Sequence, residues 1–368
     1  MKYRLGEICD VVSGGTPSRA TAEFWDGGTI PWIKIGNIQR KYVDEADEYI
    51  TQAGLEGSSA KMLSAGTILF TIFATLGEVG ILTIEACTNQ AIAGITIKNQ
   101  SDILTDYLYY FLKSQKSCIA ALGRGVAQNN INLSILRNFE VPIPDLPMQK
   151  QIVAILDKTA KVVEVRQQQL QQLDELVKAR FVELFGDGNH PHIALIDLII
   201  EGAGLSYGIV QPGDDGTGDM GVLRPVDMVD GKISTASIKY IDRSIGDGFK
   251  KTELYGDELL ITVRGTTGIT ALTDIRFNGM NVTRGIAVVR YDRNKINPVY
   301  LNAYLNTDES QRYIQEHTRG ATLQQINLSD LRVQQIMVPP LALQEQMAAF
   351  IEQTDKSKVV VQDEVNGL

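Results

Sequence analysis

The sequence has 368 residues, of which 44% are hydrophobic and 21% charged, a composition that excludes disorder as a description of the whole chain. This length favours two domains joined by connectors. The net charge of −9, with no segment that is basic overall, excludes nucleic-acid binding through bulk positive charge, so any DNA-binding surface must gather its cations on one face.

Residues 1–145 predict a β-rich domain. Short β-branched runs bounded by Gly, Asn or Asp are typical of strands, and such runs occur at 32–36, 67–72 and 92–97. A short helix is expected over 105–117, where apolar side chains recur at helical spacing. A polar loop rich in Gly and Asn follows over 123–130.

A long helix is predicted over 146–186, because Pro147 suits a first helical turn and Gly186 suits a C-terminal cap. At 1.5 Å per residue it would span roughly 55–60 Å, which is too long for one small domain. Its apolar stripe therefore predicts a partner helix. The stripe residues that we assign to the spacer or to partner docking are Ile152, Ile155, Leu156, Val162, Leu173 and Leu176.

The chain repeats itself once. Residues 131–137, Ile-Asn-Leu-Ser-x-Leu-Arg, recur at 326–332 with a constant offset of 195 residues. Two copies at so long a period indicate a duplicated domain rather than a solenoid. The second copy, residues 187–338, leads into a shorter helix over 339–368. That helix carries the apolar stripe residues Met347, Phe350 and Ile351.

These patterns predict an α+β protein with two β-rich domains in a pseudo-twofold duplicate. Two long antiparallel helices, paired as a coiled-coil spacer, separate the domains. The expected bounds are 1–145, 146–186, 187–338 and 339–368. The alternative is that each helix packs on its own domain and has no spacer role.

Motifs for catalysis are nearly absent. The sequence has no G-x-x-x-x-G-K-[ST] phosphate loop and no G-x-G-x-x-G after a predicted strand, and its three histidines offer little general-base capacity. Asn297-Pro298-Val299-Tyr300 is a weak match to a base-flipping methyltransferase motif, and a helix start explains it better. We expect no enzymatic activity, no metal and no cofactor in this chain.

Polar loop residues suit recognition instead. Arg binds guanine edges bidentately, Asn and Gln bind adenine edges, and Gly lets a backbone approach a ligand closely. Such residues recur at equivalent places in both copies. The candidate DNA contacts are Lys34, Asn37, Gln39, Arg40, Arg124, Gln128, Asn129, Asn130, Arg224, Arg264, Arg319, Gln324 and Gln325.

The order of several motifs resembles the specificity (S, HsdS) subunit of Type I restriction–modification systems, over essentially the whole chain. The motifs are Ser13–Ser18, Trp32–Ile38, Gly66–Gly77, Asn89–Ile92, Ile131–Pro144 and Gln149–Leu156. Each motif alone is a weak signal for this family, but their order, duplicated around a long helix, is specific.

The resemblance implies that the β-rich domains are target-recognition domains, each of which reads one half of a split, asymmetric sequence in double-stranded DNA. The helices set the length of the unspecified DNA between the two halves of the target, which we call the unread gap. Two modification subunits dock along the helices and supply S-adenosylmethionine and adenine-N6 methyl transfer, and motor-nuclease subunits can join for cleavage in phage defence.

Two departures and two alternatives accompany this resemblance. Residues 201–206 replace the Gly-Gly-Thr-Pro-Ser segment in the second copy, and the last helix is shorter than the first. The chain could instead serve a stand-alone or fused methyltransferase, or act as a truncated decoy scaffold that binds partners without productive DNA recognition.

Three cysteines without a C-x-x-C pair argue against a disulfide framework and a zinc ribbon. No signal peptide or membrane span is visible. We expect a cytoplasmic protein.

Overall fold

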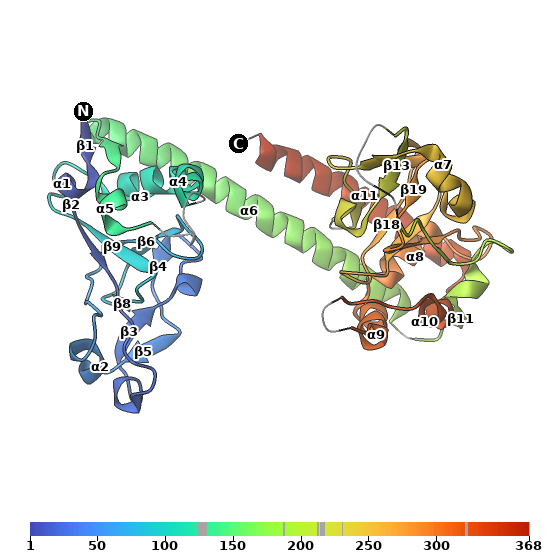
Figure 1. Ribbon diagram of the computed structural model, residues 1–368, viewed down its shortest axis with the longest axis horizontal. Coiled ribbons are helices and arrows are strands. Elements are labelled where there is room, and N and C mark those ends of the chain that lie inside the picture. Colours follow the sequence, from blue (N-terminus) through green and yellow to red (C-terminus); the bar gives the residue numbers. More distant parts are fainter. Residues whose placement is uncertain are drawn as a thin grey trace. The chain divides into compact units, whose positions relative to one another are not determined.

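The computed structural model describes residues 1–123, 131–186, 188–211, 213, 218–229, 231–320 and 323–367, with the side chains of 120–123 left out. The chain forms two compact units, Met1–Glu164 and Val165–Leu368, which are coloured from blue to green and from green to red in Figure 1.

Unit 1 is built from three small sheets. Its largest sheet has the strand order β2-β9-β6-β7-β4, and these strands span Cys9–Ser13, Ile92–Ile97, Ile68–Thr71, Val79–Leu82 and Tyr42–Val43. A second sheet has the order β5-β3-β8, with strands at Glu48–Ile50, Ile30–Ile33 and Cys87–Thr88. The third pairs β1 (Lys2–Arg4) antiparallel with β10 (Glu140–Pro142), so the two ends of the β-rich body lie side by side.

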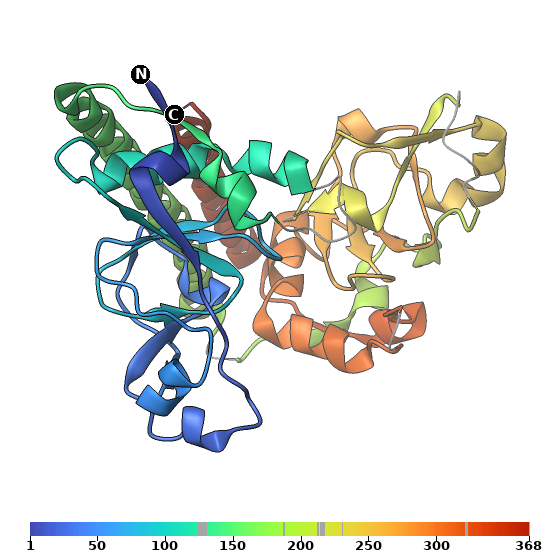
Figure 2. The same cartoon turned by 60° about the vertical axis from the view of Figure 1, so that its left-hand side comes forward.

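The core of unit 1 lies between the five-stranded sheet and α3 (Thr105–Ser114). Ile68 and Phe70 of the sheet are fully buried in one cluster with Leu108 and Leu112 of the helix, because the apolar side chains of α3 recur on one face. Figure 2 shows α3 beside this sheet. The other helices of the unit are α1 (Leu5–Ile8), α2 (Gln52–Glu56), α4 (Lys116–Gly123) and α5 (Leu133–Arg137).

A smaller core supports the three-stranded sheet of unit 1. Trp32, Ile50 and Cys87 are buried together there. The indole N–H of Trp32 donates to the Gly15 carbonyl at 2.9 Å, and the Gly15 N–H donates to the Thr88 carbonyl at 2.8 Å. The glycine-rich motif of residues 13–18 therefore passes through the interior, where its backbone links Trp32 of β3 to Thr88 of β8. We call this contact the Gly15 joint.

Unit 2 repeats these sheets. Its largest sheet has the order β12-β20-β17-β18, with strands at Ser206–Tyr207, Ile286–Val289, Leu259–Thr262 and Thr270–Leu272. The order β16-β13-β19 joins Lys239–Ile241, Met220–Leu223 and Asn281–Val282. A closing ribbon pairs β11 (His192–Ala194) with β21 (Gln335–Met337), and a hairpin pairs β14 (Met228–Val229) with β15 (Lys232–Ile233).

The helices of unit 2 follow the same order as those of unit 1. They include α7 (Arg243–Gly246), α8 (Pro298–Leu305), α9 (Asp308–His317) and α10 (Leu328–Val333). Asn297 caps α8 by accepting from the N–H groups of Val299 and Tyr300, which supports the interpretation of Asn-Pro-Val-Tyr as a helix start. Tyr300 is fully buried in the main core.

Side chains that recur in the sequence make the same contacts in both units. Arg137 of α5 donates to the Val11 carbonyl at 2.6 Å, and Arg332 of α10 donates to the Leu205 carbonyl at 2.9 Å. Each arginine ties its short helix to the first strand of the large sheet. The repeat therefore encodes a common framework, which explains the constant offset of 195 residues.

The central helix α6 spans Leu146–Phe185. In unit 1 its Asp157 carboxylate accepts from Lys41 Nζ at 2.6 Å and from the Tyr110 hydroxyl at 2.5 Å. Burial alone would raise the pKa of Asp157, but these two donors lower it below its ordinary value. This cluster fastens the first part of α6 to the β-rich body.

The remainder of α6 packs antiparallel against α11 (Leu341–Asn366) within unit 2 (Figure 1). Arg166 pairs with Glu364 at 2.6 Å, Asp174 pairs with Lys358 at 2.7 Å, and Arg180 lies over the Phe350 ring. Residue numbers rise along α6 while those of the contacting residues fall along α11, so the two helices run antiparallel. The predicted α+β architecture, with two β-rich domains and packed long helices, is confirmed.

The stripe residues predicted on the helices differ in burial. Met347 is fully buried, and Ile351 packs against the same core. Leu176, by contrast, is 49% exposed, while its neighbour Val177 packs against the core. Ile152, Val162, Leu173 and Phe350 are half-buried, and Ile155 and Leu156 are exposed. Within the described residues, no helix has the length and apolarity to cross a bilayer.

Candidate nucleic-acid interface

A rigid turn joins β17 to β18 in unit 2, and we call residues 263–268 the second turn. The Thr262 hydroxyl accepts from the Ile269 N–H at 2.9 Å, and the Thr262 carbonyl accepts from the Gly268 N–H at 2.9 Å. Gly265 has φ +86°, a left-handed conformation that glycine adopts without a steric penalty. Arg264 is the second residue of this turn and is half-buried, and in the described part of the chain its side chain has no ion pair.

The second turn holds a neighbouring loop, residues 318–326, in place. Isolated bridges pair Gln325 with both Arg264 and Arg319, and the Gly265 N–H donates to the Gln324 carbonyl at 2.9 Å. Four of the predicted contact residues are thereby brought together. Arg319 is mostly exposed and lies 3.7 Å from the Asp330 carboxylate.

Arg284 adds a cation that the sequence analysis did not single out. Its backbone N–H donates to the Ile209 carbonyl, its side chain is exposed, and no ion pair to it exists among the described residues. The next residue, Gly285, lies against Pro225 and near the Arg264 carbonyl. The position corresponds to Gln90 of the Asn89–Ile92 motif, and aligning that motif with the second copy would have identified it.

Unit 1 has the same turn at residues 72–77, which we call the first turn. The Thr71 hydroxyl accepts from the Glu78 N–H at 2.8 Å, and the Thr71 carbonyl accepts from the Gly77 N–H at 3.0 Å. Ala74 takes the place of Gly265 and has φ +58°, a conformation that costs an alanine about 1 kcal/mol or more.

Phe73 stands in the first turn where Arg264 stands in the second. Its side chain is 42% exposed, which is unusual for a phenylalanine on so small a turn. Phe73 is not among the predicted contact residues, because it lies within Gly66–Gly77, a motif that carries the family resemblance. Aligning residues 72–77 with 263–268 would have revealed it.

Ile131, the first described residue after the 123–130 loop, lies beside the first turn. The Ile131 N–H donates to the Ile72 carbonyl at 3.1 Å, as the Ile326 N–H donates to the Val263 carbonyl at 3.0 Å. Arg124, Gln128, Asn129 and Asn130 belong to that loop and lie outside the described residues.

Lys34 and Arg224 occupy equivalent turns and have internal partners. The Lys34 N–H donates to Asn37 Oδ1 at 2.9 Å, and Lys34 Nζ lies 2.6 Å from Glu48. The hydrogen bond to Glu48 raises the pKa of Lys34 and lowers that of Glu48. Arg224 makes two guanidinium hydrogen bonds, both at 3.1 Å, to the fully buried Asp227. These contacts indicate that Lys34 and Arg224 stabilise the fold. That either residue contacts DNA stays a prediction.

The remaining predicted residues of unit 1 lie just after Lys34. Gln39 Nε2 donates to the Gly36 carbonyl at 3.0 Å, and Arg40 pairs with Asp44 at 2.9 Å. Both side chains are exposed, so each can exchange its local partner for a ligand. Among the described residues, no hydrogen bond or ion pair joins either side chain to the first turn, and their DNA role also stays a prediction.

Comparison with known proteins identifies the family. Residues 1–175 and 219–364 match the family described as Type I restriction modification DNA specificity domain. The chain belongs to this family. It is the DNA specificity subunit of a Type I restriction–modification system, a non-catalytic component of that enzyme, as the sequence predicted.

Relatives of this specificity subunit span different shares of its length. The EcoR124I/EcoR124II specificity subunit of Escherichia coli is 33% identical over 160 residues, which are 42% of this chain and 39% of that relative. The MjaIX specificity subunit of Methanocaldococcus jannaschii is 22% identical over 376 residues, covering 95% of this chain and 85% of the relative.

Solved structures agree on the fold of the specificity subunit. The S subunit from M. genitalium aligns with 100% of this chain and 92% of its own, at a TM-score of 0.57 and 14% identity. A chain from a structure that concerns complex assembly and conformational transition of the type I R-M system aligns with 100% of this chain and 93% of its own, at a TM-score of 0.51 and 15% identity.

Proposed function

We propose that this subunit reads a split, asymmetric sequence in double-stranded DNA. Each unit contacts one half-site through its turn and the adjoining loop. The observation that carries the proposal is the contrast between the two turns: the same hydrogen-bonded scaffold presents Phe73 in one unit and Arg264 in the other. One scaffold with unlike tips suits two unlike half-sites, since Arg pairs with guanine and an apolar side chain contacts the thymine methyl group.

The proposal includes partners and a spacer. Helix α6 continues without a break across residues 146–185, and we propose that it fixes the unread gap between the half-sites. Two modification subunits supply S-adenosylmethionine and the adenine-N6 methyl transfer, and motor-nuclease subunits join for cleavage. Partner cations add to the phosphate grip of a chain whose own net charge is −9.

Detection of N6-methyladenine in a methylation-free host tests the proposed function. The chain is expressed with the modification subunit encoded beside it, and each protein alone is the control. We expect a methylated motif of two unlike halves at fixed spacing, seen only on co-expression. If both proteins are soluble and co-purify without any methylated motif, the proposal fails in favour of a decoy scaffold.

Changes at the two turn tips are expected to act on different halves of the target. Arg264→Ala should remove about 1–3 kcal/mol of base discrimination, or roughly 5- to 150-fold, at one position of the second half-site. Phe73→Ala should relax one position of the first half-site, and Phe73→Leu should retain part of that discrimination. Dissociation constants of the methyltransferase complex on duplexes with single base changes measure both effects.

Arg276→Ala is the matched control for the second turn. This arginine is exposed and already paired with Asp274, so its loss should leave discrimination unchanged in both halves. Equal weakening of both halves by Arg264→Ala would contradict a half-site role and point to generic phosphate contacts.

A further inference from the structure

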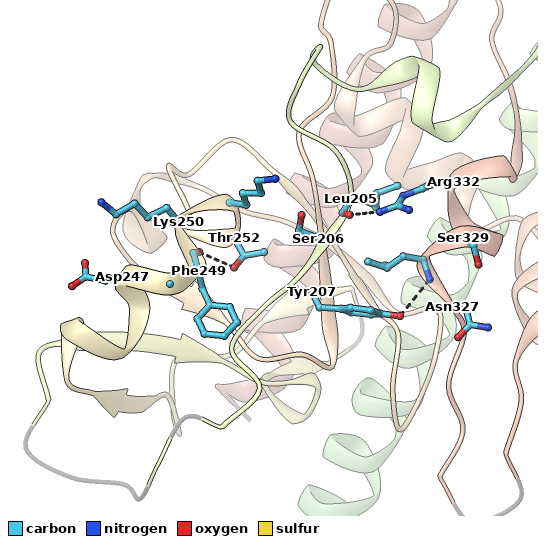
Figure 3. A pocket seen from close by; sticks show the side chains of 13 residues that line it. Leu205, Ser206, Tyr207, Asp247, Phe249, Lys250, Thr252, Asn327, Ser329 and Arg332 are labelled. Carbon is cyan, nitrogen blue, oxygen red and sulfur yellow. Dashed lines mark hydrogen bonds between the residues drawn. The ribbon is translucent and has the colours of Figure 1, made fainter.

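A positively charged pocket opens in unit 2, at some distance along the chain from the tip of the second turn. It has a volume of about 760 Å³. Its lining comes from β12, from residues 247–252, and from α10 together with Asn327, which precedes that helix. Figure 3 shows Phe249 and Lys250 on one side of Tyr207, and Asn327, Ser329 and Arg332 on the other. These residues come from three separate parts of the chain.

The charge of the pocket lining differs from that of the whole chain. Lys250, Lys251 and Arg332 line it, and Asp247 is its one acid. Lys250 and Lys251 are exposed, and neither lysine ammonium has an ion pair in the portion of the chain that is described. Two lysines without an ion pair lie along one part of the lining, and Arg332 lies along another, with Lys250 and Arg332 on opposite sides of Tyr207 (Figure 3). On a protein of net charge −9, their combined positive charge is a local attraction for an anion.

Hydrogen-bond donors in the pocket are also uncommitted. In unit 1, Asn132 caps α5 by accepting from the Ile135 N–H at 2.9 Å. Its counterpart Asn327 stands at the same place before α10 but makes no side-chain cap bond, which leaves its amide available in the pocket. The Ser329 hydroxyl lies beside it (Figure 3).

The walls of the pocket are held in place by the framework. Arg332 donates to the Leu205 carbonyl at 2.9 Å, and the Tyr207 hydroxyl accepts from the Leu328 N–H at 3.4 Å. The Thr252 hydroxyl donates to Asn281 Oδ1 at 2.8 Å. The fixed walls need no reordering when an anion binds, so the ordering cost is confined to the two exposed lysine side chains.

We propose that this pocket binds a phosphate group of the DNA strand that flanks the second half-site. The inference rests on the proposed function, because Asn327 of the pocket lining follows Gln325 of the 318–326 loop by two residues. Ammonium, amide and hydroxyl groups are the donors that proteins direct at phosphate oxygens. Such a contact sets the register of unit 2 on the duplex without reading a base.

The salt dependence of DNA binding tests this site. The complex with modification subunits is titrated with target and unrelated duplexes at several salt concentrations, using the parent chain and the double variant Lys250→Ala/Lys251→Ala. If each lysine neutralises one phosphate, the slope of log K against log salt should become less steep by about 1.8. Affinity should fall by a similar factor for both duplexes, and the methylated motif should not change.

Lys232→Ala is the control, because this exposed lysine of β15 does not line the pocket. It should leave the slope unchanged. An unaltered slope in the double variant, with its melting temperature and parent DNA binding intact, overturns the phosphate site but not the proposed function. Failure of the parent complex to bind DNA overturns the proposed function itself.

A second titration separates DNA phosphate from a free nucleotide. A fluorescent nucleoside triphosphate is added to the parent and to the double variant without DNA. No lysine-dependent binding is expected at micromolar nucleotide. Lysine-dependent nucleotide binding, with DNA affinity unchanged by the double substitution, would overturn the assignment to the DNA strand.

Discussion

Replacement of Gln149 by alanine is expected to destabilise unit 1 by about 1.5–4.5 kcal/mol, because it removes three hydrogen bonds that each contribute about 0.5–1.5 kcal/mol. The Gln149 side chain is fully buried. It accepts from the Leu104 N–H at 2.9 Å and donates to the Asp102 and Pro144 carbonyls, both at 2.8 Å. No other group near the start of α6 replaces these bonds. Calorimetry of the purified chain measures the loss.

Gln151→Ala is the matched control, since Gln151 lies on the same helix and is exposed. Gln344 makes the equivalent bonds in unit 2, to the Asn297 N–H at 2.8 Å and the Pro339 carbonyl at 2.7 Å. If Gln149→Ala and Gln151→Ala lowered stability equally, the buried glutamine would not be a framework element and helix propensity alone would explain both.

Replacement of Gly15 by alanine is expected to cost about 3 kcal/mol, at the upper end of overpacking changes, and to lower the melting temperature of unit 1 by roughly 6–12 °C. A Cβ atom at Gly15 would overlap the backbone of Ser59 and Ala60. Backbone cannot rotate away as a side chain can, and the Trp32 indole bond to the Gly15 carbonyl would be displaced as well.

Gly36→Ala controls for the change of residue type, because a Cβ atom at Gly36 meets nothing within 4 Å. It should melt with the parent. Differential scanning calorimetry compares the two variants, and amide hydrogen exchange should show earlier exchange of β3 and β8 in Gly15→Ala alone. Normal protection of those strands would show that the joint tolerates a methyl group.

The duplicated framework was predictable from sequence because its residues have partners inside each unit. Arg137 and Arg332 bind strand carbonyls at equivalent places, so any change at either is costly and the motif stays recognisable in both copies. The long helices were predictable for a related reason, since their apolar stripes and terminal Pro and Gly leave local signals.

The candidate site was less accessible to sequence reasoning. A loop cation such as Lys34 looks free in a sequence, but its partner Glu48 is brought to it by strand pairing between β3 and β5. Phe73 looks like a strand residue, since its run is apolar, and only the turn after β6 exposes it. Pairing between distant segments decides which side chains are free, and no local pattern reports it.

The closing ribbons of the two units have a consequence for synthesis. The first body cannot close until Glu140–Pro142 is available to pair with Lys2–Arg4, and the second must wait for Gln335–Met337. At roughly 5–20 residues per second, the 195-residue offset separates these events by about 10–40 s. The first body can therefore finish folding on the ribosome before the closing strand of its duplicate emerges, and the order of translation protects the two similar bodies from exchanging their closing strands.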